Sequence, residues 1–200
     1  MSDFTVFLET VREWSIREDW ADSLVTSFVR TAESELSRNM RVKEMVTIAD
    51  AQVEDSRTKL PLDWRELDFV KINGGKPILY MPVANFNAQV NGWKNHYTII
   101  GNTLQLGADI PAPDGLAVEI SYYAAAPKFE TTNTWLQNYY YDIFLQKTLA
   151  VGLLYSQKME DYAALSALVD NLIGIANEEH KISNFSGSPL KRPKTGRTLG

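Results

Sequence analysis

The fold is decided by the stretch Tyr97-Thr98-Ile99-Ile100-Gly101-Asn102-Thr103-Leu104-Gln105-Leu106. A two-residue loop at Gly101-Asn102 pairs Ile99 with Leu104 and Tyr97 with Leu106, which puts these four apolar side chains on one face. A threonine and a glutamine then meet on the other face, as expected for a strand pair with one side buried. The stretch therefore predicts an antiparallel β-hairpin whose own residues fix its register.

Strand signals continue on both sides of this hairpin. A turn at Asn73-Gly74-Gly75 separates two short apolar runs, and apolar side chains alternate with others along residues 116–122. Residues 82–90 read as a short helix that crosses between strands. The period of two and the frequent turn residues predict an antiparallel β-meander, inserted as residues 41–134 between helical segments.

Helical periods precede and follow the strands. Residues 3–40 read as two helices, and residues 143–155 form a later helix that is almost entirely apolar and should be covered on more than one side. Residues 160–179 form a further, amphipathic helix. The fold class is therefore α+β, with an N-terminal helical hairpin and C-terminal helices (1–40 and 135–181) packed as a bundle. The second N-terminal helix has an apolar stripe every fourth residue: Trp20, Leu24, Phe28, Ala32 and Leu36.

The C-terminal residues 182–200 differ in charge from the rest of the chain. The net charge is −5, but the last fifteen residues contain four cations and no acid, so the other 185 residues carry 16 cations and 25 acids, a net charge of −9. This segment cannot bury enough apolar surface to fold alone, which predicts an extended basic arm that orders on a partner. We favour a protein partner over DNA, because four cations give only a salt-sensitive attraction to phosphate. The candidate partner-binding residues are Lys191, Arg192, Lys194 and Arg197.

Composition excludes several classes of protein. Two hundred residues suffice for one self-sufficient core, and the absence of cysteine excludes disulfides and thiolate metal sites. The N-terminus lacks the layout of a signal peptide, and the longest apolar stretch, 149–155, is too short to span a bilayer, so we expect a cytoplasmic product with no membrane partner. The acidic body argues against a surface that grips nucleic acid.

No recognised catalytic motif occurs. We interpret His96 and His180 as surface or capping residues, since no motif places an acid or a nucleophile beside them. The acid pairs Glu18-Asp19, Glu54-Asp55 and Glu160-Asp161 would serve a glycosidase only if such carboxylates converged, which the sequence cannot show. Asn73-Gly74-Gly75-Lys76 lacks the spacing of a phosphate-binding loop. The sequence predicts a non-enzyme with no catalytic residue, cofactor or metal ligand.

Aromatic residues are plentiful, with 5 Trp, 9 Tyr and 8 Phe. Consecutive residues such as Tyr139-Tyr140-Tyr141 cannot all face one core, so some must face a second surface or water. A stacking platform for sugars would also use such residues, but a protein interface is favoured because cations are scarce nearby. The candidate subunit-interface residues lie on the apolar helix: Phe144, Val151, Leu153 and Tyr155.

Several stretches together resemble the head-to-tail adaptor proteins of tailed bacteriophages, over about residues 5–180. One set comes from the predicted strands: residues 73–80, 97–106 and 119–123, with Pro127 following. The other comes from the helices: Ala32-Glu33, Leu36, Arg38, Met40-Arg41-Val42 and Trp135-Leu136.

The resemblance implies a structural virion protein at the head-tail junction, assembled in the host cytoplasm. Such adaptors form a homo-oligomeric ring, commonly of twelve subunits, that docks under the portal protein and joins it to a tail or nozzle protein. Genomic DNA would pass through the channel without specific binding. Two alternatives stay open: an aromatic-rich carbohydrate-binding module, and a cell-wall glycoside hydrolase of a phage tail, for which Glu119 is a candidate carboxylate.

Overall fold

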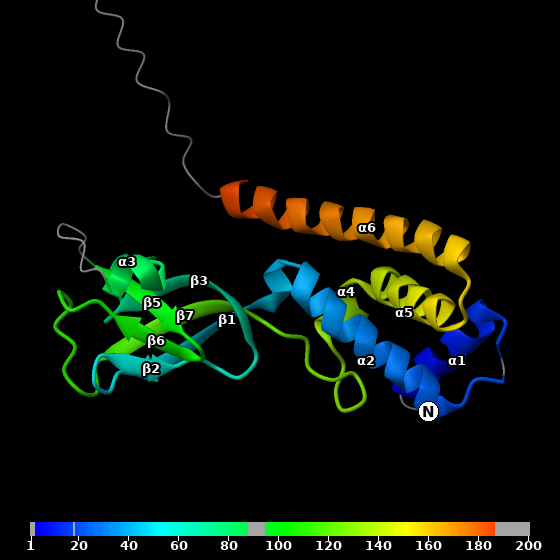
Figure 1. The fold of residues 1–200 in the computed structure, drawn as a ribbon, viewed down its shortest axis with the longest axis horizontal. Helices are drawn as coiled ribbons and strands as arrows, with labels where there is room; N and C mark the ends of the chain where they lie inside the picture. The colour runs from blue at the N-terminus through cyan, green and yellow to red at the C-terminus, as the bar shows by residue number, and fades with distance from the viewer. Residues whose placement is uncertain (1–2, 18, 88–94, 187–200) are drawn as a thin grey trace, which may run out of the picture.

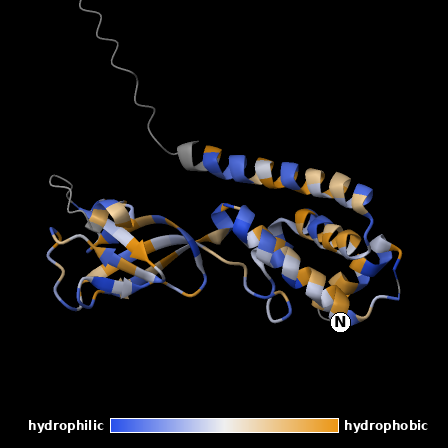
Figure 2. Cartoon of the chain, viewed as in Figure 1, coloured by the Kyte–Doolittle hydropathy of each residue, from blue (hydrophilic) through white to orange (hydrophobic). Residues whose placement is uncertain are grey.

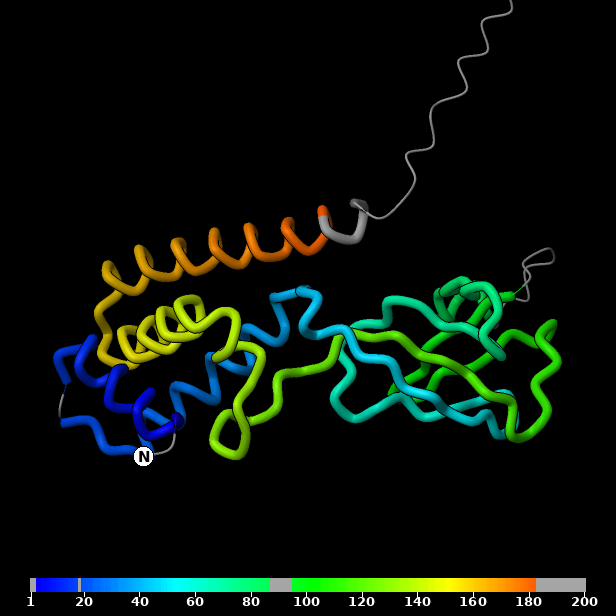
Figure 3. Tube along the Cα trace, turned by 180° about the vertical axis from the view of Figure 1, so that it is seen from behind, coloured from blue at the N-terminus to red at the C-terminus, as the bar shows by residue number. Residues whose placement is uncertain are grey.

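The computed structural model describes residues 3–17, 19–87 and 95–186. The chain is elongated, with helices at one end and a curved sheet at the other (Figure 1). Two segments join these regions side by side, one entering β1 and one leaving β7 (Figure 3). The long helices are α1 (Asp3–Ser15), α2 (Asp22–Asn39), α5 (Tyr141–Tyr155) and α6 (Met159–Ser186), and a short α4 (Trp135–Tyr139) precedes α5.

The helical region is built around α5. The predicted stripe of α2 is confirmed for Phe28, Ala32 and Leu36, which are buried, whereas Leu24 is half-buried and Trp20 lies before the helix begins. Helix α5 contacts α1, α2, α4 and α6, so the expected covering on more than one side is also confirmed. Trp20, in the connection before α2, lies so close to α5 at Gly152 that a Cβ atom there would be 2.8 Å from its ring. Figure 2 shows α5 largely in the orange shades that mark hydrophobic residues.

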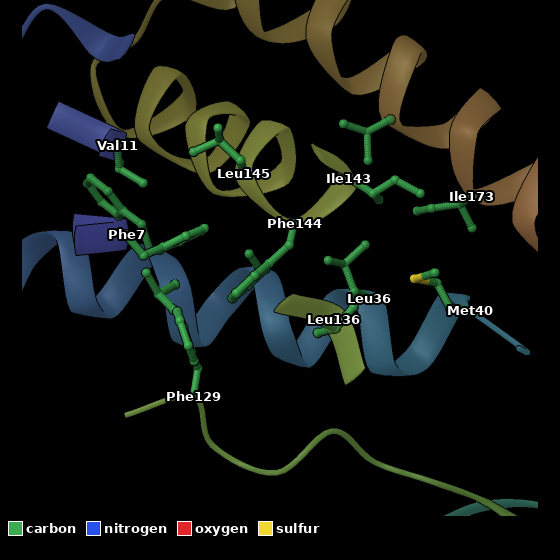
Figure 4. Packing of buried hydrophobic residues seen from close by; sticks show 14 of the residues in the cluster. Phe7, Val11, Leu36, Met40, Phe129, Leu136, Ile143, Phe144, Leu145 and Ile173 are labelled. Carbon is green, nitrogen blue, oxygen red and sulfur yellow. The ribbon is translucent and has the colours of Figure 1, made fainter. Parts of the chain in front are cut away.

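The connection from the sheet to α4 also belongs to the helical core. Phe129 lies beneath α2 and points into the aromatic cluster of Phe7 and Phe144 (Figure 4). Thr134 then caps α4, because its hydroxyl oxygen accepts a hydrogen bond from the backbone N–H of Gln137 at 3.3 Å. The expected insertion, 41–134, therefore contributes its last residues to the helical region.

The sheet has seven strands and is nearly closed into a barrel. The hairpin of β5 and β6 has the predicted register, with Ile99 opposite Leu104 and Tyr97 opposite Leu106. The turn at Asn73-Gly74-Gly75 joins β3 to β4 as expected. The strands are β1 (Val46–Gln52), β2 (Arg57–Lys59), β3 (Trp64–Ile72), β4 (Pro77–Tyr80), β5 (His96–Ile100), β6 (Thr103–Leu106) and β7 (Ala117–Ala124).

The predicted antiparallel meander is wrong. The strand order is β1-β7-β3-β4-β5-β6-β2, and β4 pairs with β5 in parallel. Parallel neighbours need a crossover between them, and the short α3 (Val83–Asn87) lies in this connection, inside the expected 82–90. Residues 88–90 of that expectation lie outside the described residues.

Helix α6 ties the two regions together. Asn177 accepts a hydrogen bond from the backbone N–H of Arg41 at 2.6 Å and donates one to the carbonyl of Asn39 at 3.1 Å. Farther along, the ring nitrogen Nε2 of His180 lies 2.9 Å from the hydroxyl of Tyr123 on β7. The helix continues to Ser186, so residues 182–186 are helical and do not belong to an extended arm.

Candidate interaction surfaces

The residues considered for catalysis lie apart from one another. Glu54-Asp55 is in the turn between β1 and β2, whereas Glu160-Asp161 opens α6 at the opposite end of the molecule (Figure 1). His96 faces Asp109, with 3.6 Å between Nδ1 and Oδ1, and His180 is buried on α6. Within the described ranges, no group of three or more His, Cys, Asp or Glu side chains could hold a metal ion.

The predicted partner-binding cations of the arm, Lys191, Arg192, Lys194 and Arg197, lie outside the described residues. The predicted interface residues of α5 separate into two kinds. Phe144 is fully buried in the chain's own core, which corrects its assignment to a subunit interface, because a neighbouring chain cannot reach it there. The other three remain candidates: Val151 and Leu153 are half-buried, and Tyr155 is exposed.

An apolar hollow lies near the C-terminal ends of α1 and α5 and the N-terminal end of α6. We call it the helical-end groove; its volume is about 230 Å³. Trp14 and Ile16 at its edge are 64% and 88% exposed, which is unusual for side chains of this size. Arg17 and Lys158 add positive charge to the lining. Its apolar lining residues are Trp14, Ile16, Trp20, Leu149, Leu153 and Leu165.

Two contacts of Arg12 tie the end of α1 to the start of α2 beside this groove. The guanidinium of Arg12 donates to the backbone carbonyl of Trp20 at 2.9 Å and also pairs with Asp22 at the start of α2. Within the turn, Ile16 has a φ of 55°, a left-handed conformation that is costly for a β-branched residue. An isoleucine is thus kept at the most exposed point of the groove, in a conformation that glycine or asparagine would adopt more easily.

A second exposed apolar surface lies along α6. Leu168, Ile175 and Ile182 are 46%, 50% and 67% exposed. They are spaced by seven residues, which places them on one side of the helix over roughly 21 Å. We call these three residues the α6 ridge. The buried face of α6, which includes Val169, is a different one.

Two acidic side chains of α2 contact other parts of the helical region. Glu33 is buried, and its carboxylate accepts a hydrogen bond from the backbone N–H of Phe129 at 2.7 Å. Burial raises the pKa of Glu33 above its ordinary value, and the nearby Glu130 adds to the shift. Glu35 lies 2.5 Å from the ammonium group of Lys147, which is buried on α5.

We expect Glu33→Gln to be at least as stable as the wild type near pH 7. Because the folded chain binds the Glu33 proton more tightly than the unfolded chain, the ionised carboxylate costs stability, and this cost falls as the pH drops through the raised pKa. The amide oxygen still accepts the hydrogen bond from Phe129. Urea unfolding at several pH values should show that the advantage of the variant shrinks toward acid.

Glu33→Ala is the contrasting variant. It leaves the N–H of Phe129 without its acceptor, and we expect a loss of about 1–3 kcal/mol at every pH. A Glu33→Gln protein that is as unstable as Glu33→Ala would contradict this account of the buried carboxyl group.

The sequence indicated only part of these surfaces. Leu153 belongs to the groove, but Trp14 and Ile16 were not identified, although two large apolar residues directly before a charged stretch were the available signal. Residues 160–179 are predicted as an amphipathic helix, yet the exposure of Leu168 and Ile175 within it depends on how α6 rotates against α5. Helix packing of this kind is a tertiary property.

A family model described as SU10 adaptor protein matches residues 2–192. The curated proteins contain no match to the chain. In the part of the chain that the structure describes, no helix combines the length and the apolar character needed to cross a membrane.

Proposed function

Since the chain belongs to the SU10 adaptor protein family, we propose that it is the ring-forming head-to-tail adaptor of a tailed bacteriophage. The family makes it a structural adaptor protein of the virion. The proposal adds that the ring has twelve subunits, docks under the portal protein and joins it to a tail or nozzle protein. It also adds that the ring leaves a channel for the DNA.

The observation that best supports a ring is the pair of exposed apolar surfaces in the helical region. A closed ring needs a head-to-tail interface, in which each subunit presents two different patches. The helical-end groove and the α6 ridge are two such patches, one concave and one convex. The three ridge residues lie outside the chain's own core, whereas Trp20 and Leu149 of the groove pack in or against it, so the groove's free apolar surface comes from its exposed edge at Trp14 and Ile16.

The charge of the chain supports passage of DNA without binding. Residues 1–185 carry a net charge of −9, and a negatively charged channel repels phosphate where a basic one would hold it. The proposed non-specific passage is therefore consistent with the acidic body, and the basic arm is left for a protein partner.

Mass measurement tests the proposal. We expect the full chain, mixed with its portal protein, to give a complex that contains twelve copies of the chain bound to one portal assembly. The chain measured alone reports whether the ring forms before docking. If no complex with the portal forms and the chain stays monomeric in both samples, the proposed function is wrong.

Truncation after Ser186 is expected to leave the fold intact and weaken docking to the portal. The removed segment holds four cations, and their contacts with a protein partner would be lost. The binding constant should be measured by titration at two salt concentrations. A variant with glutamine at Lys191, Arg192, Lys194 and Arg197 separates charge from length. Unchanged docking by both variants would contradict a role for the arm.

A further inference from the structure

We propose that the α6 ridge of one copy packs into the helical-end groove of the next copy around the ring. This inference rests on the proposed ring and names the surfaces that form its repeating contact. It assigns Leu168, Ile175 and Ile182 to one side of each interface. It assigns the groove around Ile16 and Leu153 to the other side.

The shapes of the two surfaces suit each other. The ridge is a row of aliphatic side chains along a straight helix, with anchors at seven-residue intervals, as in helices that bind apolar grooves. The groove is an apolar hollow of about 230 Å³, large enough to receive aliphatic side chains from a helix. The exposed Trp14 beside it offers a large rigid surface of the kind enriched at interface centres.

Charge favours a second copy of this chain as the occupant of the groove. The groove carries Lys158, for which the described residues provide no ion pair, and Arg17, which forms an ion pair with Asp19 at 4.0 Å. Glu179, one turn after Ile175, is exposed between two residues of the ridge. A ridge placed in the groove can bring this carboxylate toward Lys158, for which the described residues provide no partner of opposite charge.

The backbone conformation of Ile16 gives an independent reason to place a neighbouring copy on the groove. A β-branched residue in the left-handed region is strained, and such strain persists where the surrounding structure or a function maintains it. Here the side chain is 88% exposed, so packing within the chain does not account for it. A contact with the neighbouring copy would bury this side chain.

Disulfide cross-linking tests the contact, because the chain contains no cysteine. The double variant Ile16→Cys/Ile175→Cys should form a ladder of covalent multimers when oxidised with diamide, and reduction should return it to monomers. Each single variant should stay monomeric on a non-reducing gel, because cysteines cross-link only where their Cα atoms approach within about 7 Å. The matched control is Ile16→Cys/Leu62→Cys, in which the second cysteine is on an exposed residue of the sheet region.

The outcomes of this experiment distinguish an error in the proposed contact from an error in the proposed ring. Dimers from the single Ile175→Cys variant would mean that ridge meets ridge, and would overturn the inference. Monomers from the double variant, under conditions where mass measurement finds the wild-type ring, would overturn the inference but leave the proposed function standing. A wild-type chain that is monomeric alone and with the portal would overturn both.

Discussion

Replacing Phe144 by alanine is expected to lower the free energy of unfolding of the isolated chain by about 3–5 kcal/mol. Phe144 is completely buried and stacks on Phe7, with 4.7 Å between ring centroids and 18° between ring planes. It also meets the edge of Phe129, 5.8 Å away. Figure 4 shows it between these rings on one side and Leu36 and Leu136 on the other. Truncation leaves a cavity that helices on several sides cannot collapse to fill.

Tyr155→Ala is the matched control on the same helix. Tyr155 is 60% exposed, and its ring meets only Phe28 among the aromatic contacts of the described residues. We expect it to cost about 1 kcal/mol or less. Urea unfolding followed by tryptophan fluorescence measures both. Equal losses for the two variants would contradict the placement of Phe144 in the core and restore it as a candidate interface residue.

The local elements of this fold could be predicted from the sequence. The β5–β6 hairpin was correct to the residue, because its register depends only on a two-residue loop and the alternation beside it. The later part of the α2 stripe, from Phe28 to Leu36, was correct because a helical period repeats along this helix. In both cases the residues that specify the structure lie next to one another in the chain.

The order of the strands could not be predicted in the same way. Strand β1 pairs with β7, which lies about seventy residues later in the chain. Nothing in the sequence of either strand identifies the other as its pairing partner. The parallel pairing of β4 and β5 depends on where the crossing helix places the chain. A meander assumes that sequence neighbours pair, and this assumption failed at both places.

The candidate interaction surfaces show the same limit. Composition predicted surplus apolar surface, and the structure places some of it at Ile175 and in the helical-end groove. The sequence could not show that Phe144 faces inward and Tyr155 outward, because both lie on a helix that is apolar on nearly every side. Only the arrangement of α1, α2 and α6 around α5 decides between them.

Glu35→Ala is expected to lower the free energy of unfolding by about 2–3 kcal/mol, because it leaves the ammonium group of Lys147 buried without its carboxylate. Lys147 is 7% exposed, whereas Glu35 is partly open to solvent, and this places the expected loss below that of a fully buried pair. Lys147 is the only charged residue of the apolar stretch 143–155. The sequence could not show that the carboxylate partner of Lys147 is Glu35 on α2.

Lys147→Met separates the charge from the packing. Methionine keeps an unbranched side chain of similar length and leaves Glu35 with solvent as a partner, so we expect a change of no more than about 1 kcal/mol. The double variant Glu35→Ala/Lys147→Met should then recover most of the stability lost in Glu35→Ala, because no buried charge is left unpaired. Urea unfolding of the three variants completes a double-mutant cycle. A double variant no more stable than Glu35→Ala would mean that Glu35 stabilises α2 and α5 by packing, and that the isolated ammonium group is not the cause of the loss.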